Sequence, residues 1–400
     1  GGTLVLRTDE MLTSVATFLK ACQEWKLTVL DLPTAYWQQI VSELATTDVM
    51  LPESLRLMII GGERALPESV KLWQKCVGDY PQLLNTYGPT EGTIVATTYK
   101  VTASTQLKKE VPIGRAIANC QTYILDKNLQ PVPIGIPGEL YIGGTGLARG
   151  YLNRPELTQE TFIANPFSKD LNSRLYKTGD RVRYLSDGNI EFIGRIDNQV
   201  KIRGFRIELG EIEAVLSQHL QVSAVVVIAR EDQPGNKRLV AYFVSNSEQS
   251  ITDELRSFLK IKLPDYMLPS AFVQLDKFPL TPNGKVDCRA LAQLEIEDNL
   301  SNNFVPPRNS TEAQLAAIWS SVLGIKHVGI DHNFFELGGH SLLATKVLSM
   351  IQKTFEVELP LRYFFEASTI AELAQHIETI YWVKHNSPST LTEGLEEIEL

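Results

Sequence analysis

The spacing of hydrophobic positions changes several times along the chain. Over residues 1–100, a helical pattern in MLTSVATFLKACQEW is followed by short apolar runs, LTVLDLP and LRLMIIGG, that predict buried strands. Alternation of this kind is typical of helices packed on a largely parallel sheet. The apolar run at the very start, GGTLVL, also predicts a strand.

A second pattern begins near residue 110 and continues to 195. Short apolar runs, as in QTYILDKNLQPVPIGIPGELYIGG, are broken by Gly, Pro, Asn and Asp, which predicts an antiparallel β subdomain. Residues 198–290 then follow a β-α-β-β-α-β order that opens with a strand, QVKIRGFRIE, and a helix, LGEIEAVLSQHL. A unit of that size is small enough to be a lid.

The last part of the chain carries helical patterns only. Residues 311–380 contain TEAQLAAIWSSVL, SLLATKVLSMIQKTF and TIAELAQHIETI, which predict a small four-helix bundle. The preceding residues, 291–310, are polar, acidic and contain Pro, as expected of a linker. Residues 381–400 are polar and acidic, so we interpret them as a disordered tail or a connector.

These patterns together predict a multidomain fold rather than one compact domain. The expected parts are an α/β large subdomain with its β subdomain over 1–196, an α+β lid over 197–290, a linker over 291–310, an all-α bundle over 311–380 and a tail over 381–400.

Composition narrows the class of protein. Hydrophobic residues make up 44% and charged residues 21%, which is ordinary for a soluble globular protein. The net charge of −9 argues against a nucleic-acid partner. We find no apolar run of about 18 residues and no secretory signal, so we expect neither a membrane span nor secretion. The 4 cysteines are far apart and form no C-x-x-C pair, so we expect neither a zinc site nor a disulfide framework. This pattern is typical of a protein in the reducing cytosol.

The sharpest local signal is DHNFFELGGHSLLATKV, residues 331–347. Gly338 and Gly339 permit a tight turn before a helix that starts around Ser341. A hydroxyl at a helix N-terminus lies where backbone N–H groups and the helix dipole favour a phosphate, so the site suits a phosphodiester-linked group. The plain alternative is a serine that only caps the helix.

The whole string resembles the L-G-G-H/D-S-L motif of carrier domains in nonribosomal peptide synthetases. This resemblance implies that a phosphopantetheinyl transferase attaches 4′-phosphopantetheine to Ser341, and that the thiol of the arm carries an amino acid as a thioester. Upstream, NTYGPTEGT (85–93) resembles the adenine-and-metal loop of the acyl-adenylate-forming superfamily. The resemblance implies that Tyr87 stacks on adenine and that Thr90 and Glu91 lie near the phosphates and Mg²⁺, although a Y-G-P-T run alone could be a turn.

Later motifs of that superfamily follow in the expected order. RLYKTGD and GRIDNQVKIRGFRIELGEIE imply that Asp180 binds the ribose hydroxyls, Arg195 helps bind the nucleotide and Asp197 is a hinge. PNGKVD implies that Lys285 is the catalytic lysine, whose charge offsets the negative charge that develops during attack on the α-phosphate. GELYIGGTGLARGYLNRPELT and LPDYMLP also match. The glycines have neither dinucleotide-binding nor Walker A spacing.

The resemblance also implies an amino-acid pocket. Its members on this chain would be Asp31, Ile59, Gly61, Thr86, Ile94 and Val95, with the Lys285 ammonium. Simple core packing is the alternative for the three aliphatic side chains. A carboxylate in an apolar pocket costs free energy unless it is paired or protonated. Asp31 therefore either reads a polar or cationic substrate side chain or caps a local turn.

The implied function is ATP-dependent activation of an amino acid as aminoacyl-AMP and its transfer to the arm on Ser341. The Ser/Thr/Gly-rich loop that grips the ATP phosphates and the aspartate that pairs with the substrate amine are not in the sequence, which has no initiator Met. We therefore interpret the chain as a fragment and expect it to adenylate poorly alone. Rival interpretations are a free-standing acyl-CoA ligase, a carrier-containing carboxylate reductase and a scaffold with a decayed adenylation domain.

The implied partners follow from the same resemblance. They are the amino acid, a phosphopantetheinyl transferase, neighbouring condensation, thioesterase or other synthetase domains, and a small MbtH-like helper protein. The implied cofactors are ATP, Mg²⁺ and covalent phosphopantetheine, and the expected location is the cytoplasm.

Overall fold

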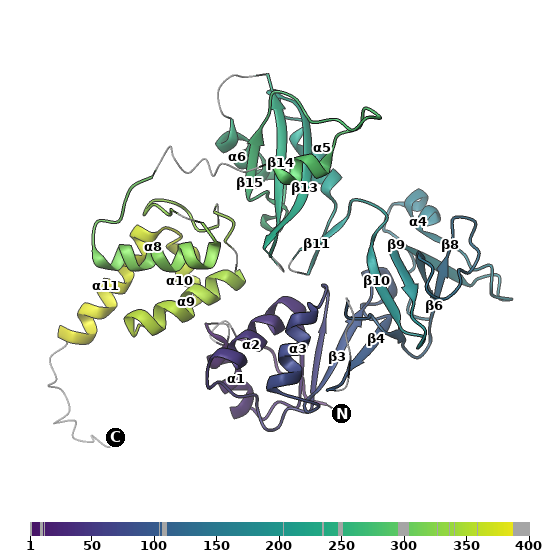
Figure 1. Cartoon of the computed structure of the whole chain (residues 1–400), viewed down its shortest axis with the longest axis horizontal. Coiled ribbons are helices and arrows are strands. Elements are labelled where there is room, and N and C mark those ends of the chain that lie inside the picture. Colours follow the sequence, from purple (N-terminus) through teal and green to yellow (C-terminus); the bar gives the residue numbers. More distant parts are fainter. Residues whose placement is uncertain are drawn as a thin grey trace, which may run out of the picture. The chain divides into compact units, whose positions relative to one another are not determined.

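The computed structural model divides into two compact units (Figure 1). One covers residues 19–295, and the other groups residues 296–400 with 1–18. No described helix has the length and apolar character needed to cross a membrane. The residues that the structure describes are 2–8, 11, 13–103, 105, 110–202, 204–233, 236–246, 251–294, 304–325, 327–335, 337–339, 341–357 and 359–386.

The first sheet of the larger unit is mainly parallel at its start, as predicted. Strands β1, β2 and β3 run parallel, while β4 and β5 each pair antiparallel with the strand before them. Helices α2 and α3 connect the parallel strands and pack through Trp37 and Trp73, whose ring centroids are 6.0 Å apart. The elements are β1 (Val29–Pro33), α2 (Thr34–Thr46), β2 (Leu57–Gly61), α3 (Pro67–Cys76), β3 (Gln82–Tyr87), β4 (Thr97–Val101) and β5 (Arg115–Ala116), after α1 (Val15–Glu24).

The strand predicted for GGTLVL is wrong. Residues 2–8 lie in neither a helix nor a strand, and their side chains are exposed. Apolar composition alone does not make a strand, because a strand needs a neighbour to accept and donate its backbone hydrogen bonds. None of the described sheets includes these residues.

The second sheet is fully antiparallel, as its broken apolar pattern predicted. Its strand order is β10-β9-β7-β6, and β8 also pairs with β9. Leu140, Ile142 and Val182 form its core together with Tyr87, the last residue of β3. The end of the first sheet is therefore anchored in the second. The elements are β6 (Cys120–Leu125), β7 (Gly138–Gly144), α4 (Pro155–Thr161), β8 (Phe162–Ala164), β9 (Arg174–Tyr184) and β10 (Ile190–Arg195).

The segment QVKIRGFRIE forms a hairpin and not the single strand that its pattern predicted. Gly204 has a φ of +78°, a left-handed conformation that glycine adopts freely, and the chain turns back so that Ile202 pairs with Phe205. Beyond the hairpin, side chains of α5 and α6 pack on the sheet of β13, β14 and β15 around Phe243. The elements are β11 (Val200–Ile202), β12 (Phe205–Ile207), α5 (Leu209–Leu216), β13 (Val222–Gln233), β14 (Asn236–Ser245), α6 (Thr252–Lys262), β15 (Ala271–Gln274) and α7 (Cys288–Gln293).

The C-terminal unit is a helical bundle around an aromatic core, as predicted. The Phe334 ring lies between Trp319 and Phe364, with centroid distances of 4.9 and 4.7 Å. A side chain at Gly339 would place its Cβ 2.3 Å from that same Phe334 ring, so the close approach requires glycine. The helices are α8 (Ser310–Leu323), α9 (Ser341–Phe355), α10 (Leu361–Glu366) and α11 (Ile370–Asn386).

Candidate functional site

Tyr87 and Asp180 meet in the larger unit although they lie 93 positions apart in the sequence. The buried Tyr87 hydroxyl donates a hydrogen bond to one Asp180 carboxylate oxygen, and Arg195 Nη1 donates to the other at 2.8 Å. Asp180 is 4% exposed. Burial and the neighbouring Asp180 charge raise the Tyr87 pKa well above its usual value, so this hydroxyl stays a neutral donor. The structure thus brings together three residues that the motifs had assigned to one nucleotide.

The Arg195 guanidinium also holds Asp197, the predicted hinge. Its Nε and Nη2 donate to the two Asp197 carboxylate oxygens at 2.6 and 2.5 Å. Partial burial alone would raise the Asp197 pKa, but the hydrogen bonds and charge of Arg195 lower it below the usual value. A Cβ at Gly179, where φ is +72°, would lie 2.6 Å from Arg195 Nη2. Glycine at that position therefore lets one guanidinium bridge two carboxylates.

Glu91 lies on a short 3₁₀ turn, η2 (Thr90–Gly92), and is 7% exposed. Tyr151 donates its hydroxyl to Glu91 Oε1 at 2.5 Å, and Arg206 Nη1 lies 2.9 Å from Oε1 and 2.7 Å from Oε2. Burial alone would raise the Glu91 pKa, but these two partners lower it, so the carboxylate is ionised at neutral pH. Thr90, its predicted neighbour at a metal, is exposed.

Sequence reasoning missed two contributors to this cluster, Tyr151 and Arg206. Both lie in segments that match family motifs, Arg206 in GRIDNQVKIRGFRIELGEIE and Tyr151 in GELYIGGTGLARGYLNRPELT, so a signal existed, but nothing in it indicated a contact with Glu91. Arg206 Nη2 also reaches the Tyr176 hydroxyl at 3.2 Å. Hydrophobic periodicity indicates only which residues share a face of one helix or strand. It could not show that side chains from different elements converge.

The β11–β12 hairpin supplies further contacts to the same region. The Lys201 ammonium lies 5.4 Å from the centroid of the Tyr87 ring, and burial lowers the Lys201 pKa. The Gly204 amide donates to the Glu63 carboxylate. Lys285, in contrast, is exposed, and no hydrogen bond or ion pair joins it to Tyr87, Asp180 or Glu91. In this arrangement the hairpin, and not the predicted catalytic lysine, faces the cluster.

The predicted substrate-pocket residues fall into two groups. Asp31 and Ile59 pair across β1 and β2, and Thr86 Oγ1 on β3 donates to the Ile60 carbonyl at 2.9 Å. Gly61 lies so close to Thr86 that a Cβ would fall 2.4 Å from that hydroxyl. Ile94 and Val95 instead follow η2, with Ile94 exposed and Val95 partly buried.

Asp31 is exposed, although the neighbouring chain removes enough water to raise its pKa. Its carboxylate makes no hydrogen bond or ion pair with a described residue. Capping a turn requires such a bond, so the structure gives that alternative no support, and a contact with the substrate side chain stays a prediction.

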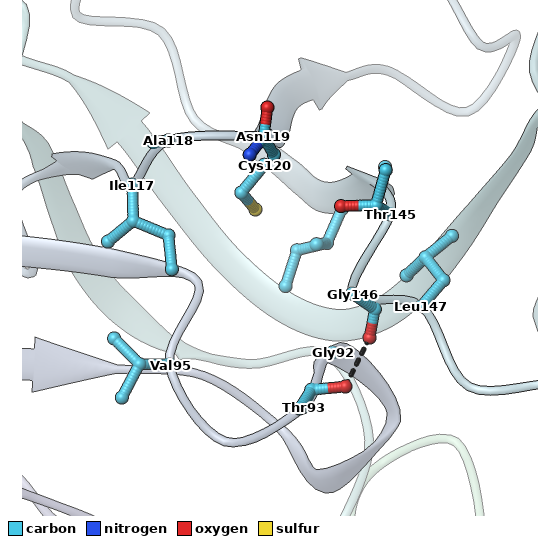
Figure 2. A pocket seen from close by; sticks show the side chains of 12 residues that line it. Gly92, Thr93, Val95, Ile117, Ala118, Asn119, Cys120, Thr145, Gly146 and Leu147 are labelled. Carbon is cyan, nitrogen blue, oxygen red and sulfur yellow. Dashed lines mark hydrogen bonds between the residues drawn. The ribbon is translucent and has the colours of Figure 1, made fainter. Parts of the chain in front are cut away.

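A cavity of about 200 Å³ opens beside η2. Figure 2 shows that Val95 and Ile117 line one side, while Thr93 donates its hydroxyl to the Gly146 carbonyl on another. Val95 is the predicted pocket residue that lines it. The hydrogen bond ties the segment NTYGPTEGT to the glycine-rich segment after β7.

In the C-terminal unit, α9 begins at Ser341, as predicted, and Gly338 has a φ of +89°. The helix therefore starts directly after a tight turn. The Ser341 side chain lies outside the described part of the chain, so its role stays a prediction.

Three protein families match successive parts of the chain. Residues 1–152 match the AMP-binding enzymes, and residues 211–285 match the C-terminal domain of AMP-binding enzymes. Residues 313–377 match the phosphopantetheine attachment site.

The curated relatives are named as synthases. A linear gramicidin synthase protein of Brevibacillus parabrevis is 51% identical over 332 residues, which is 82% of this chain and 6% of that protein. Tyrocidine synthase 3 of the same organism is 49% identical over 347 residues, 86% of this chain and 5% of that protein. The chain thus spans about a twentieth of the length of these relatives.

Solved structures show the same order of parts. A nonribosomal peptide synthetase protein with adenylation and PCP domains, bound to a vinylsulfonamide inhibitor, gives a TM-score of 0.74 at 28% identity, covering 92% of this chain and 60% of that one. An artificially fused adenylation–PCP di-domain from Klebsiella oxytoca gives a TM-score of 0.57 at 26% identity, covering 94% and 60%.

Proposed function

The chain belongs to the nonribosomal peptide synthetases, as part of an adenylation domain followed by a carrier domain, and from this we propose what it does in its parent protein. It activates an amino acid as an aminoacyl adenylate and transfers it as a thioester to a phosphopantetheine arm on Ser341. The observation that carries the proposal is the convergence of Tyr87, Asp180 and Arg195 from separate segments on one buried hydrogen-bonded cluster.

The roles of the cluster follow from its chemistry. Each Asp180 oxygen accepts one hydrogen bond here and has a further lone pair that suits a ribose hydroxyl. The Tyr87 ring, over which Lys201 lies in this arrangement, would offer an aromatic face to adenine once the hairpin moves away. Arg195 supplies positive charge beside them. These three residues would hold and orient the nucleotide, so that its α-phosphate meets the amino-acid carboxylate in a fixed geometry.

Mg²⁺ is part of the proposal, and Glu91 is the carboxylate that would bind it. No group of three or more His, Cys, Asp or Glu in the described residues could enclose a metal. Mg²⁺, however, commonly binds through one or two carboxylates, waters and substrate phosphates. The ionised, buried Glu91 is such a ligand, with Thr90 beside it on η2. When bound, the metal neutralises phosphate charge.

Two reactions follow each other in this scheme. In the first, an amino-acid carboxylate oxygen bonds to the α-phosphorus, the bond from that phosphorus to the bridging oxygen breaks, and pyrophosphate leaves. In the second, the pantetheine thiol gives its proton to solvent and its sulfur bonds to the acyl carbon, the bond from that carbon to the phosphate oxygen breaks, and AMP leaves with that oxygen. Lys285 would serve the first reaction, since its charge offsets that of the transition state.

Movement of the lid about Asp197 would connect the two reactions. Asp197 lies between β10 and β11, where the chain passes into the lid. The hairpin now faces Glu91 and Tyr87 while Lys285 is exposed. A rotation at the hinge exchanges these two lid segments at the site.

The remaining parts of the proposal concern the cellular location and the partners of the parent protein. We place the parent protein in the cytoplasm, with a phosphopantetheinyl transferase and neighbouring condensation, thioesterase or other synthetase domains as partners, and an MbtH-like helper protein as a further one. That the 400-residue chain adenylates poorly alone stays a prediction.

Intact-protein mass spectrometry tests the carrier function. The chain is incubated with coenzyme A and a broad-specificity phosphopantetheinyl transferase, and one phosphopantetheine should be added. Ser341→Ala should receive none. A wild-type chain that stays unmodified, or a Ser341→Ala chain that gains the arm, contradicts the proposal. ATP–pyrophosphate exchange by the parent protein, screened over the amino acids, tests adenylation and identifies the substrate.

A further inference from the structure

The Glu91 carboxylate already has a cation. Arg206 Nη1 lies within hydrogen-bonding distance of both Glu91 oxygens, at 2.9 and 2.7 Å, and Tyr151 donates to Oε1 as well. The Glu91 side chain is 9% exposed and the Arg206 side chain 31%, so the carboxylate is shielded from water while the guanidinium keeps part of its surface in solvent. The charge that would attract Mg²⁺ is therefore neutralised from within the chain.

Arg206 reaches Glu91 only because the whole β11–β12 hairpin is docked there. On one side of Arg206, the Gly204 amide donates to Glu63, and a Cβ at Gly62 would lie 3.8 Å from the Gly204 Cα. Lys201 lies over the Tyr87 ring. The contact between Arg206 and Glu91 thus reports where the hairpin lies.

The stacked Phe205 and Tyr266 rings, with centroids 4.2 Å apart, fix the hairpin to the rest of the lid. If the lid moves, Arg206 moves with it.

Arg206 and a magnesium ion could not share this carboxylate. Mg²⁺ binds oxygen at about 2.0–2.1 Å and holds nearly octahedral geometry. With Nη1 bonded to both oxygens and a Tyr151 hydroxyl on one, three of the roughly four lone-pair sites of the carboxylate are already engaged. A divalent cation and a guanidinium at such a distance also repel each other strongly in a partly buried site.

We propose that Arg206 is a positioning residue that takes the place of Mg²⁺ on Glu91, so that metal binding there and docking of the β11–β12 hairpin exclude each other. The proposal rests on the proposed function, because it takes Glu91 as the metal ligand. Docking of the hairpin then follows loss of the metal, and the arrangement of the lid depends on the stage of the reaction.

Metal affinity tests the proposal, because the proposal predicts tighter metal binding when Arg206 is replaced. A merely structural role of Arg206 would not give that increase. Mn²⁺ also prefers oxygen ligands, and its binding to the chain is measured by water-proton relaxation. Arg206→Gln removes the competing cation, so Glu91 is free to bind a metal in a larger fraction of the molecules. Because apparent affinity rises with that fraction, Mn²⁺ should bind at least about threefold more tightly. Glu91→Gln should lose this binding.

A matched control comes from the same chain. Arg183 pairs with Glu191 through Nε and Nη2, each 2.6 Å from Glu191 Oε2, away from the hairpin. Arg183→Gln should leave the Mn²⁺ affinity unchanged. Arg206→Lys keeps a positive charge without the fork of donors, and it should fall between wild type and Arg206→Gln.

Hydrogen exchange of residues 200–207 gives a second readout. In the wild-type chain, MgCl₂ should speed exchange of these amides relative to NaCl at equal ionic strength, because the hairpin undocks. In Arg206→Gln the exchange should be fast with either salt. Weaker or unchanged Mn²⁺ binding by Arg206→Gln, undiminished binding by Glu91→Gln, or wild-type exchange that ignores Mg²⁺ would each overturn the proposal.

These measurements separate the proposal from the function on which it rests. Neither Mn²⁺ binding nor hydrogen exchange requires adenylation or a modified Ser341. Failure of phosphopantetheine attachment or of pyrophosphate exchange by the parent protein therefore counts against the proposed function alone.

Discussion

Single side chains at the candidate site do more than one task. Arg195 bridges Asp180 and Asp197, so the residue expected to hold a ribose and the residue expected to be the hinge share one guanidinium. A buried carboxylate such as that of Asp180, which is 4% exposed, is tolerated only when it is paired and hydrogen-bonded. A change in the groups that are hydrogen-bonded to the Asp180 carboxylate would therefore alter the environment of Asp197, the predicted hinge.

Gly179→Ala tests that arrangement. The added Cβ would fall 2.6 Å from Arg195 Nη2 and 2.9 Å from Asp197 Oδ2, at a φ of +72°. We expect a loss of about 1–2 kcal/mol in the free energy of unfolding from the left-handed conformation, and weaker AMP binding by the parent protein. Urea unfolding and calorimetric titration measure the two effects.

Gly188→Ala is the control, because Gly188 has a φ of +82° and no contact with Arg195. It should lower stability by a similar amount and leave AMP binding unchanged. Equal weakening of AMP binding by the two variants would count against a specific role of Gly179.

At the scale of elements, the start of α9 is fixed by an aromatic contact. Gly339 packs against the Phe334 ring, which lies in the core between Trp319 and Phe364. The turn before Ser341 is thus held by the interior of the bundle and not only by local backbone preference. The position of the predicted attachment site depends on that packing.

Gly339→Ala should therefore slow attachment of phosphopantetheine. Its Cβ would lie 2.3 Å from the Phe334 ring, and such overpacking typically costs about 1–3 kcal/mol. The displaced turn should present Ser341 poorly to the transferase, as a mass-spectrometric time course would record. Gly324→Ala, at a φ of +72° after α8, adds strain away from this turn. If both variants slow attachment alike, loss of stability and not the turn is responsible.

At the scale of the whole molecule, the two units have separate hydrophobic cores. The bundle core is formed by residues of α8 to α11 and the loops between them, while the lid and the second sheet have cores of their own. Separate cores predict separate unfolding transitions, because cooperativity follows shared packing.

Ile351→Val, within α9, tests this separation by scanning calorimetry. Ile351 is fully buried in the bundle, and loss of one methylene typically costs about 0.5–1.5 kcal/mol. For a domain of this size, each kcal/mol lowers the Tm by roughly 4–8 °C. We expect one transition to shift and the rest to stay. A common shift of all transitions would show that the units unfold together.

The sequence alone was enough to predict most elements and the family. Helices such as α8 and α9 and the antiparallel second sheet were predicted because their apolar periodicity is local. Two predictions failed for reasons beyond local pattern. GGTLVL has no described strand beside it, and KIRGFRIE turns back at Gly204 although its composition suits a strand.

Motif order along the chain, read by resemblance, assigned roles to Tyr87, Asp180, Arg195 and Glu91 before their contacts were known. Only the tertiary structure decided that Arg206 neutralises Glu91 while Tyr151 donates a hydrogen bond to it, and that Lys285 is exposed while the hairpin is docked. The physical reason is distance along the chain. Contacts between segments more than a hundred positions apart, such as that of Arg206 with Glu91, depend on how sheets and lid pack, which periodicity and motif spacing do not encode.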